Sequence, residues 1–216
     1  MLKKLTALLF PPKCVLCRSL LTSEVSTLCP SCSINAPVCE KTARSIPFVE
    51  KWTVLWYYDD IVRKSFLRFK FYGARSYAVP YGKLLAEKLS REYPEELPLL
   101  TWTPISKRRK RKRGYDQTEL IAQIVARELN VPLVSTLQRT RDSKPQSTLR
   151  DPSARRANVL GAYSVIDKTR IAGKNILLLD DIITTGVTVS ECAKTLLTAG
   201  AAKVHCAALA TPHPKK

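Results

Sequence analysis

The stretch at residues 176–188, which reads ILLLDDIITTGVT, decides the fold of this chain. Its four opening apolar residues are too few for a helix, and Gly173 and two aspartates bound them, so they predict a strand buried on both faces. A short turn rich in hydroxyl groups follows. Residues 189–199 then have the pattern of a helix. We therefore expect an α/β fold in which this strand is central.

The turn after this strand has the composition of a phosphate site. Backbone N–H groups converge at a helix N-terminus, the helix dipole favours negative charge there, and threonine hydroxyls add donors. Gly186 lets the backbone approach a ligand closely. The carboxylates of Asp180 and Asp181 can accept hydrogen bonds from ribose hydroxyls. An ordinary strand with a capped helix would not explain two adjacent charges there, because unpaired buried charge is costly. The residues predict a site for a ribose 5-phosphate group.

Four cysteines near the N-terminus form two Cys-x2-Cys pairs that are separated by eleven residues: Cys14, Cys17, Cys29 and Cys32. This spacing is typical of a four-thiolate Zn²⁺ site. Disulfides are the first alternative, but a reducing compartment disfavours them. A redox-active pair is the second, and it would not need the other two thiols. We expect a structural zinc finger or ribbon at residues 1–45, a linker at residues 37–47 and the main domain at residues 50–216.

The chain is strongly basic, with 36 lysines and arginines against 18 acidic residues and a net charge of +18. Residues 61–115 alone hold 15 basic and four acidic residues. Such a charge predicts a polyanionic partner, with nucleic acid as the first candidate. A solvated basic surface without a partner is the alternative.

Seven consecutive basic residues occupy positions 107–113. Nuclear signals and disordered tails often contain such runs. Here the run lies between a strand expected at residues 99–103 and a helix expected at residues 117–129. This position is the carboxyl edge of the predicted sheet, where ligands bind in open α/β folds.

Basic and aromatic residues are interleaved in a helix expected at residues 59–72. Stacking combined with phosphate contacts is how proteins hold single-stranded nucleic acid. An amphipathic helix that buries Phe66 and Phe69 explains the same residues equally well. We predict single-stranded DNA as a partner, contacted by Arg68, Lys70, Arg109, Lys110, Arg111, Lys112 and Arg113.

The remaining segments complete an alternating α/β pattern. Strands are expected at residues 52–58, 131–137, 162–165 and 203–210, and a helix at residues 78–92. Residues 139–160 lack apolar periodicity, which favours a functional loop. The apolar run at residues 5–10 is too short for a signal peptide. We expect an amphipathic helix there, no membrane span and a cytoplasmic location.

The stretch at residues 176–188 resembles the phosphoribosyl diphosphate (PRPP) signature of type I phosphoribosyltransferases. The resemblance implies a mostly parallel sheet flanked by helices, a loop after residue 104 that holds the pyrophosphate, and a flexible loop at residues 140–158. Mg²⁺ would bridge ribose and pyrophosphate. The implied PRPP-binding residues are Asp180, Asp181, Thr184, Thr185, Gly186, Val187 and Thr188, together with Ser106, Lys107 and Arg108. Whether the basic run serves pyrophosphate, DNA or both stays open.

Four features together resemble the ComF family of competence proteins: the cysteine pairs behind Phe-Pro-Pro at residues 10–12, the block PISKRRKRKRGYDQ at residues 104–117, the segment at residues 144–159 and the PRPP signature. This resemblance implies a role in natural transformation, acting on incoming single-stranded DNA with a helicase-like protein and a recombination mediator. The chain departs from the pattern at Asp116, where many relatives have asparagine, and at Cys39, where relatives often have a further cysteine pair.

Two other functions share the same expected PRPP site. One is a metabolic phosphoribosyltransferase that moves ribose 5-phosphate onto an amine or a base. The other is a PRPP-sensing regulator without turnover. A base-specific transferase needs a hood that contacts its nucleobase, and no segment of the sequence is dedicated to that task, because the N-terminal module takes the spare length.

Overall fold

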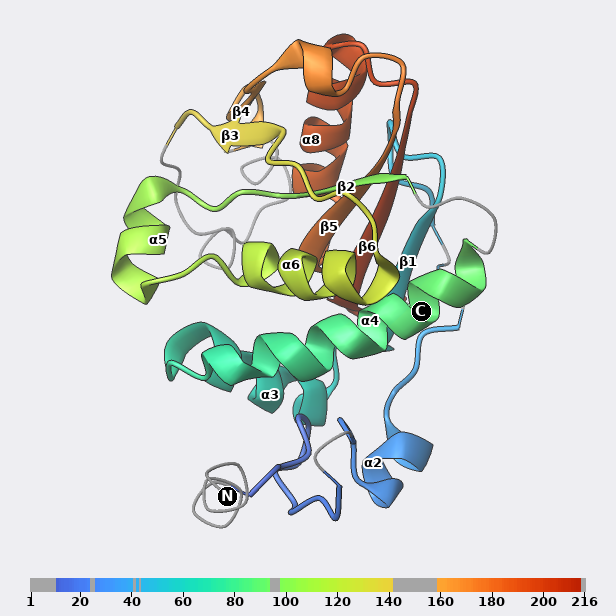
Figure 1. Cartoon of the computed structure of the whole chain (residues 1–216), viewed down its shortest axis with the longest axis vertical. Helices are drawn as coiled ribbons and strands as arrows, with labels where there is room; N and C mark the ends of the chain where they lie inside the picture. Colours follow the sequence, from blue (N-terminus) through green and yellow to red (C-terminus); the bar gives the residue numbers. More distant parts are fainter. Residues whose placement is uncertain are drawn as a thin grey trace.

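The computed structural model describes residues 11–23, 26–40, 42, 44–93, 98–141 and 159–214. Its centre is a four-stranded sheet in the order β1-β6-β5-β2, in which every neighbouring pair is parallel (Figure 1). These strands are β1 (Trp52–Tyr57), β2 (Leu99–Trp102), β5 (Asn175–Ile182) and β6 (Lys203–Thr211). Parallel neighbours require crossover connections, and helices provide them.

Helices cover both faces of this sheet. One face packs against α3 (Asp60–Phe71), α4 (Ala78–Glu92) and α6 (Gln117–Leu129), and the other against α8 (Val187–Thr198). In β5, Leu177 and Leu179 join the first core, while Ile176 and Leu178 join the second. All four side chains are at most 1% exposed. The predicted strand buried on both faces is confirmed, and so is the type I phosphoribosyltransferase-like fold class.

The strand expected at residues 131–137 is wrong. Only an isolated parallel bridge joins Leu133 to Leu100 of β2. Pro132 has no N–H to donate to a ladder, although its carbonyl accepts from the Leu100 amide at 3.1 Å. The regular strand β3 (Leu137–Arg139) begins later and pairs antiparallel with β4 (Tyr163–Val165) in a separate two-stranded sheet.

The basic run forms a helix, α5 (Lys107–Arg113), where the family resemblance implied a loop. Lysine and arginine have straight side chains that lose little freedom in a helix. Ser106 caps the helix, since its Oγ accepts a hydrogen bond from the Arg109 amide at 3.4 Å. Gly114 ends it in the left-handed conformation, with φ of 78°. The three residues expected to hold pyrophosphate thus form the cap and first turn of a helix.

The four-cysteine segment, residues 11–23 and 26–36, lies below α3 and α4 in Figure 1 and contains α2 (Pro30–Asn35). The expected linker does not begin as a free chain: Val38 bridges Trp56 of β1, and the Cys39 amide donates to the Leu55 carbonyl at 2.9 Å. The described residues also include short 3-10 turns at Arg75–Tyr77 and Lys168–Arg170.

Two expectations lie outside the described residues, namely the amphipathic helix at residues 5–10 and most of the flexible loop at residues 140–158. Among the helices that the structure describes, none is long and apolar enough to cross a membrane.

A close contact between α4 and α6 generates the first prediction. A Cβ atom at Gly82 would overlap the side chain of Ile124 and lie 3.3 Å from the Ile121 carbonyl oxygen. We expect Gly82→Ala to lower the free energy of unfolding by about 1–2 kcal/mol, because overpacking costs more than alanine gains in helix propensity. Urea denaturation measures this change. In an Ile124→Gly background, which lacks both the Cβ and the Cγ2 atom that the new methyl group would overlap, the same substitution should cost less, and equal costs in both backgrounds would contradict the contact.

Candidate functional site

The turn between β5 and α8 has the geometry of an anion site. The strand ends at Ile182 and the helix begins at Val187, with Gly186 at the N-cap in the left-handed conformation, φ 78°. The Gly186 carbonyl accepts the first helical hydrogen bond, from the Ser190 amide at 2.8 Å. Amides in the first turn of a helix have no acceptor within that helix, so their dipoles favour an anion at this turn.

Two carboxylates lie at the end of β5, which is longer than predicted and includes both of them. The Oδ1 atom of Asp180 accepts hydrogen bonds from the Thr103 hydroxyl and the Asp181 amide, each at 2.8 Å. Burial is the main cause that raises the pKa of Asp180 to about 7, and the negative charge of Asp181 is the second cause. A carboxyl group whose pKa is raised by burial and by a neighbouring charge is a candidate functional group.

Lys70 lies beside the carboxylate pair. The sequence had predicted that this residue contacts DNA. Its Nζ is 2.7 Å from Oδ2 of Asp181, and both side chains are 18% exposed. The ammonium group therefore compensates the charge of Asp181. Lys70 comes from the last turn of α3, so a helix on one face of the sheet supplies a cation to the carboxyl end of a strand.

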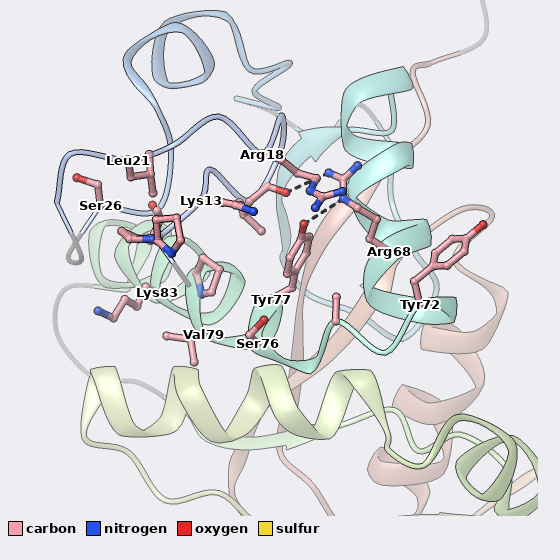
Figure 2. A pocket seen from close by; sticks show the side chains of 16 residues that line it. Lys13, Arg18, Leu21, Ser26, Arg68, Tyr72, Ser76, Tyr77, Val79 and Lys83 are labelled. Atoms are coloured by element: carbon pink, nitrogen blue, oxygen red, sulfur yellow. Dashed lines mark hydrogen bonds between the residues drawn. The ribbon is translucent and has the colours of Figure 1, made fainter. Parts of the chain in front are cut away.

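Arg68 also differs from its predicted role. Its guanidinium donates to the carbonyl oxygens of Val15 and Leu16 and, at 3.0 Å, to the Tyr77 hydroxyl (Figure 2). These bonds attach the four-cysteine segment to α3, so Arg68 has a structural role. Phe66 and Phe69 are fully buried in the core, which confirms the amphipathic-helix alternative for these two rings.

Most of α5 faces solvent. Lys107, Arg108, Arg111 and Lys112 are exposed, and within the described part of the chain no carboxylate pairs with them. Lys110 instead lies 2.7 Å from Glu119, and Arg113 donates to the Gln117 side chain at 2.7 Å. The helix starts directly after β2, whose partner in the sheet is β5. The basic residues and the carboxylate pair thus lie at the same edge of the sheet, as predicted.

Asp116 is a structural residue in this region. It is 3% exposed and accepts hydrogen bonds from the amides of Ile105, Thr118 and Glu119 at 3.0–3.2 Å. Burial raises its pKa, although the amide hydrogen bonds act in the opposite direction. Its carboxylate therefore caps α6 and fixes the start of α5, and it adds no charge to the exposed basic surface.

Sequence analysis missed two partners of this site. Thr103 donates to Asp180, and its position directly after a strand at the carboxyl edge was a usable signal. Arg44 donates to the carbonyl of Thr184 in the turn. Arg44 precedes β1 by several residues and carried no signal, because only the folded chain brings it to residue 184.

The sulfur atoms of Cys14, Cys17, Cys29 and Cys32 all lie within 4.8 Å of one another. Cys17 Sγ and Cys29 Sγ are 3.6 Å apart. A tetrahedral ion with metal–sulfur distances of about 2.3 Å requires sulfur–sulfur distances of about 3.8 Å, so the cluster fits one metal ion. Cys39 lies outside the cluster, and Cys192 and Cys206 are fully buried in the core, as expected.

Comparisons with known proteins agree with this geometry. A family model described as the phosphoribosyl transferase domain matches residues 118–216. Competence protein ComFC of Bacillus subtilis is 29% identical over 88% of this chain and 79% of its own length. Competence protein F of Haemophilus influenzae is 25% identical over 92% of this chain and 96% of its own length. DNA utilization protein YhgH of Escherichia coli K12 is 28% identical over 88% of this chain and 86% of its own length.

Solved structures with a similar fold are more distant. The allosteric regulatory enzyme of purine biosynthesis matches 61% of this chain and 26% of its own, at 22% identity and a TM-score of 0.41. Purine phosphoribosyltransferase from Pyrococcus horikoshii matches 66% of this chain and 75% of its own, at 17% identity and a TM-score of 0.38.

The chain therefore has a type I phosphoribosyltransferase-like fold, and its residues 118–216 match the model of the phosphoribosyl transferase domain. Its resemblance to the ComF family of competence proteins is confirmed by curated relatives that match most of its length.

The cysteine cluster generates a prediction about metal content. We expect the purified protein to hold one metal ion per chain, and Cys14→Ser with Cys17→Ser to release it, because the ion would lose two of its four ligands. Elemental mass spectrometry measures the bound metal. Cys39→Ala serves as the matched control and should retain the ion. A full metal content in the double variant would contradict a four-thiolate site.

Proposed function

We propose that this protein is a ComF-like protein of natural transformation that binds PRPP and single-stranded DNA. The observation that carries the proposal is the placement of three groups at one edge of the sheet. A carboxylate pair ends β5, an anion-binding turn follows it, and a helix of seven basic residues begins after the neighbouring strand β2. A phosphorylated sugar and a polyanion can both be bound from this edge.

In the proposed PRPP site, the turn at residues 184–188 holds the 5-phosphate, and Asp180 and Asp181 accept hydrogen bonds from the ribose hydroxyls. Lys70 must then leave Asp181 or share it with the ligand, which is feasible because the pair is partly exposed. Ser106, Lys107 and Arg108 lie at the N-terminal end of α5 and are proposed to contact the pyrophosphate. Mg²⁺ bound with PRPP would neutralise part of the pyrophosphate charge.

In the proposed DNA site, the exposed residues of α5 contact phosphates. The curated relatives are named for competence and for DNA utilization, and these names favour a role with DNA over a purely metabolic transferase. A regulator that senses PRPP without turnover shares the same pocket and stays an alternative. The cytoplasmic location, the helicase-like partner and the recombination mediator rest on the family resemblance and stay predictions.

We propose Zn²⁺ for the cysteine cluster. Four thiolates satisfy the tetrahedral preference of zinc and leave no open position for substrate, so the ion is structural. Three of the four cysteines are buried against the same core as Phe66 and Tyr81. The metal would therefore stabilise the attachment of the four-cysteine segment to the main domain.

The carboxylate pair provides the test of PRPP binding. We expect Asp180→Ala with Asp181→Ala to weaken PRPP binding about 100-fold or more, because two charge-assisted acceptors are lost. Isothermal calorimetry with Mg²⁺ at pH 8, above the pKa of Asp180, measures the affinity. Asp60→Ala removes an exposed carboxylate that pairs with Lys64 and is the control. Unchanged affinity in the double variant of a well-folded protein would overturn the proposed PRPP site.

The exposed part of α5 provides the test of DNA binding. Glutamine at Lys107, Arg108, Arg111 and Lys112 should weaken binding of a single strand and reduce the slope of log affinity against log salt by about 3. Fluorescence anisotropy at several salt concentrations measures both. The control variant, called the remote variant below, carries glutamine at four exposed basic residues elsewhere: Lys168, Arg170, Lys174 and Lys194. An unchanged slope in the α5 variant would assign α5 to pyrophosphate alone.

A further inference from the structure

A groove of about 810 Å³ separates the four-cysteine segment from the main domain (Figure 2). Described residues within 11–21 and residues 26 and 27 contribute one wall, and the end of α3, the turn Arg75–Tyr77 and the start of α4 contribute the other. Figure 2 shows Lys13, Arg18 and Lys83 along the groove, with Arg68 at one end. The groove is therefore a product of how the segment docks onto the helices.

Among the residues that the structure describes, the charged side chains that line the groove are all basic. Lys13, Arg18, Arg68 and Lys83 line it, and no acidic residue is among its described lining residues. Arg68 is occupied by carbonyl groups. The other three take part in no ion pair between the residues that the structure describes. Uncompensated cations in a concave surface concentrate field lines and favour an anionic ligand.

Arg18 occupies a strained backbone position in this wall. Its φ is +72°, a conformation that an L-residue with a side chain adopts at a cost and that glycine adopts freely. The strain follows from the tight turn after Cys17, in which the Arg18 amide donates to the Cys14 carbonyl at 2.9 Å. Arg18 combines a strained backbone with a charged side chain that lines the groove. Strain of this kind often accompanies a functional role of the residue.

The groove also offers an aromatic surface. The Tyr72 side chain, which lines it, is 78% exposed, and the preceding Phe71 is 63% exposed. Large aromatic rings are usually buried when a core is available to them. Exposed rings beside cations are the arrangement that stacks unpaired bases while phosphates are neutralised.

The C-terminal end of α5 lies next to residues that adjoin the lining of the groove. The Arg113 guanidinium lies 5.2 Å from the centre of the Phe71 ring. Arg75 donates to the carbonyl of Gly114, the residue that ends α5, at 3.0 Å. The C-terminal end of α5 therefore contacts the residues that lead into the groove, so one extended chain can follow both surfaces.

We propose that the groove binds the continuation of the single strand beyond α5, with phosphates at Lys13, Arg18 and Lys83 and a base stacked on Tyr72. The proposal rests on the DNA binding proposed above and adds a second contact region to it. It also gives the four-cysteine segment a direct task, because that segment supplies two of the three cations. A duplex does not fit this task, since its bases are not available for stacking.

The test uses fluorescence anisotropy with a labelled oligothymidine strand and the full-length protein. Lys13→Gln, Arg18→Gly and Lys83→Gln together should reduce the salt slope by about 2, because three phosphate contacts are lost. Tyr72→Ala should weaken binding about five-fold or more without changing the slope. Arg18→Gly alone should weaken binding while the melting temperature stays equal or rises, because glycine relieves the strained backbone. PRPP affinity should stay unchanged in all of these variants.

The outcomes separate this inference from the proposed function. If the wild-type protein does not bind the strand, DNA binding and the groove proposal both fail. If the wild type binds and the α5 variant is weakened, but the groove variants behave like the remote variant, the groove proposal alone is overturned. Thymidine 5′-monophosphate is the competitor. If it displaces the strand as effectively as unlabelled oligothymidine at equal nucleotide concentration, the groove is a small-anion site and the proposal is wrong.

Discussion

The contact between Lys70 and the carboxylate pair at the end of β5 is the interaction on which this site depends. Two adjacent carboxylates lose hydration and repel each other, so a fold that places them at the end of a buried strand must supply compensation. Lys70 supplies a positive charge at 2.7 Å from Asp181, and Thr103 supplies a hydroxyl donor to Asp180. These two contacts hold the carboxylates at the edge of the sheet.

Lys70, which compensates the charge of Asp181, links the carboxylate pair to α3. Lys70 belongs to α3, which also bears Arg68 two residues earlier. Because successive residues of a helix point in different directions, the same turn of α3 reaches the carboxylate pair with one cation and the four-cysteine segment with the other. A shift of α3 would therefore disturb both the carboxylate pair and the attachment of the four-cysteine segment.

Much of the architecture followed from local pattern. The helices at residues 78–92 and 117–129 were expected with their observed bounds, since each has an apolar face of helical period. The strand expected at residues 131–137 was wrong, although Pro132 was a usable signal in the sequence, because a proline cannot donate a hydrogen bond to a ladder. The basic run was expected as a loop on family resemblance, yet its residues are good helix formers between a serine cap and a terminal glycine. Intrinsic propensity was the better guide there.

The sequence by itself determined the chemistry of the two sites. The cysteine spacing and the stretch ILLLDDIITTGVT need only local geometry to bring their groups together. The tertiary structure alone decided what the separate cations do. Lys70 and Arg68 were both predicted to contact DNA, but one neutralises Asp181 and the other binds carbonyl groups of the N-terminal segment. Their partners lie more than fifty residues away in the chain or on another layer of the fold. A side chain's partner at such separation depends on how helices cross the sheet, which local sequence does not encode.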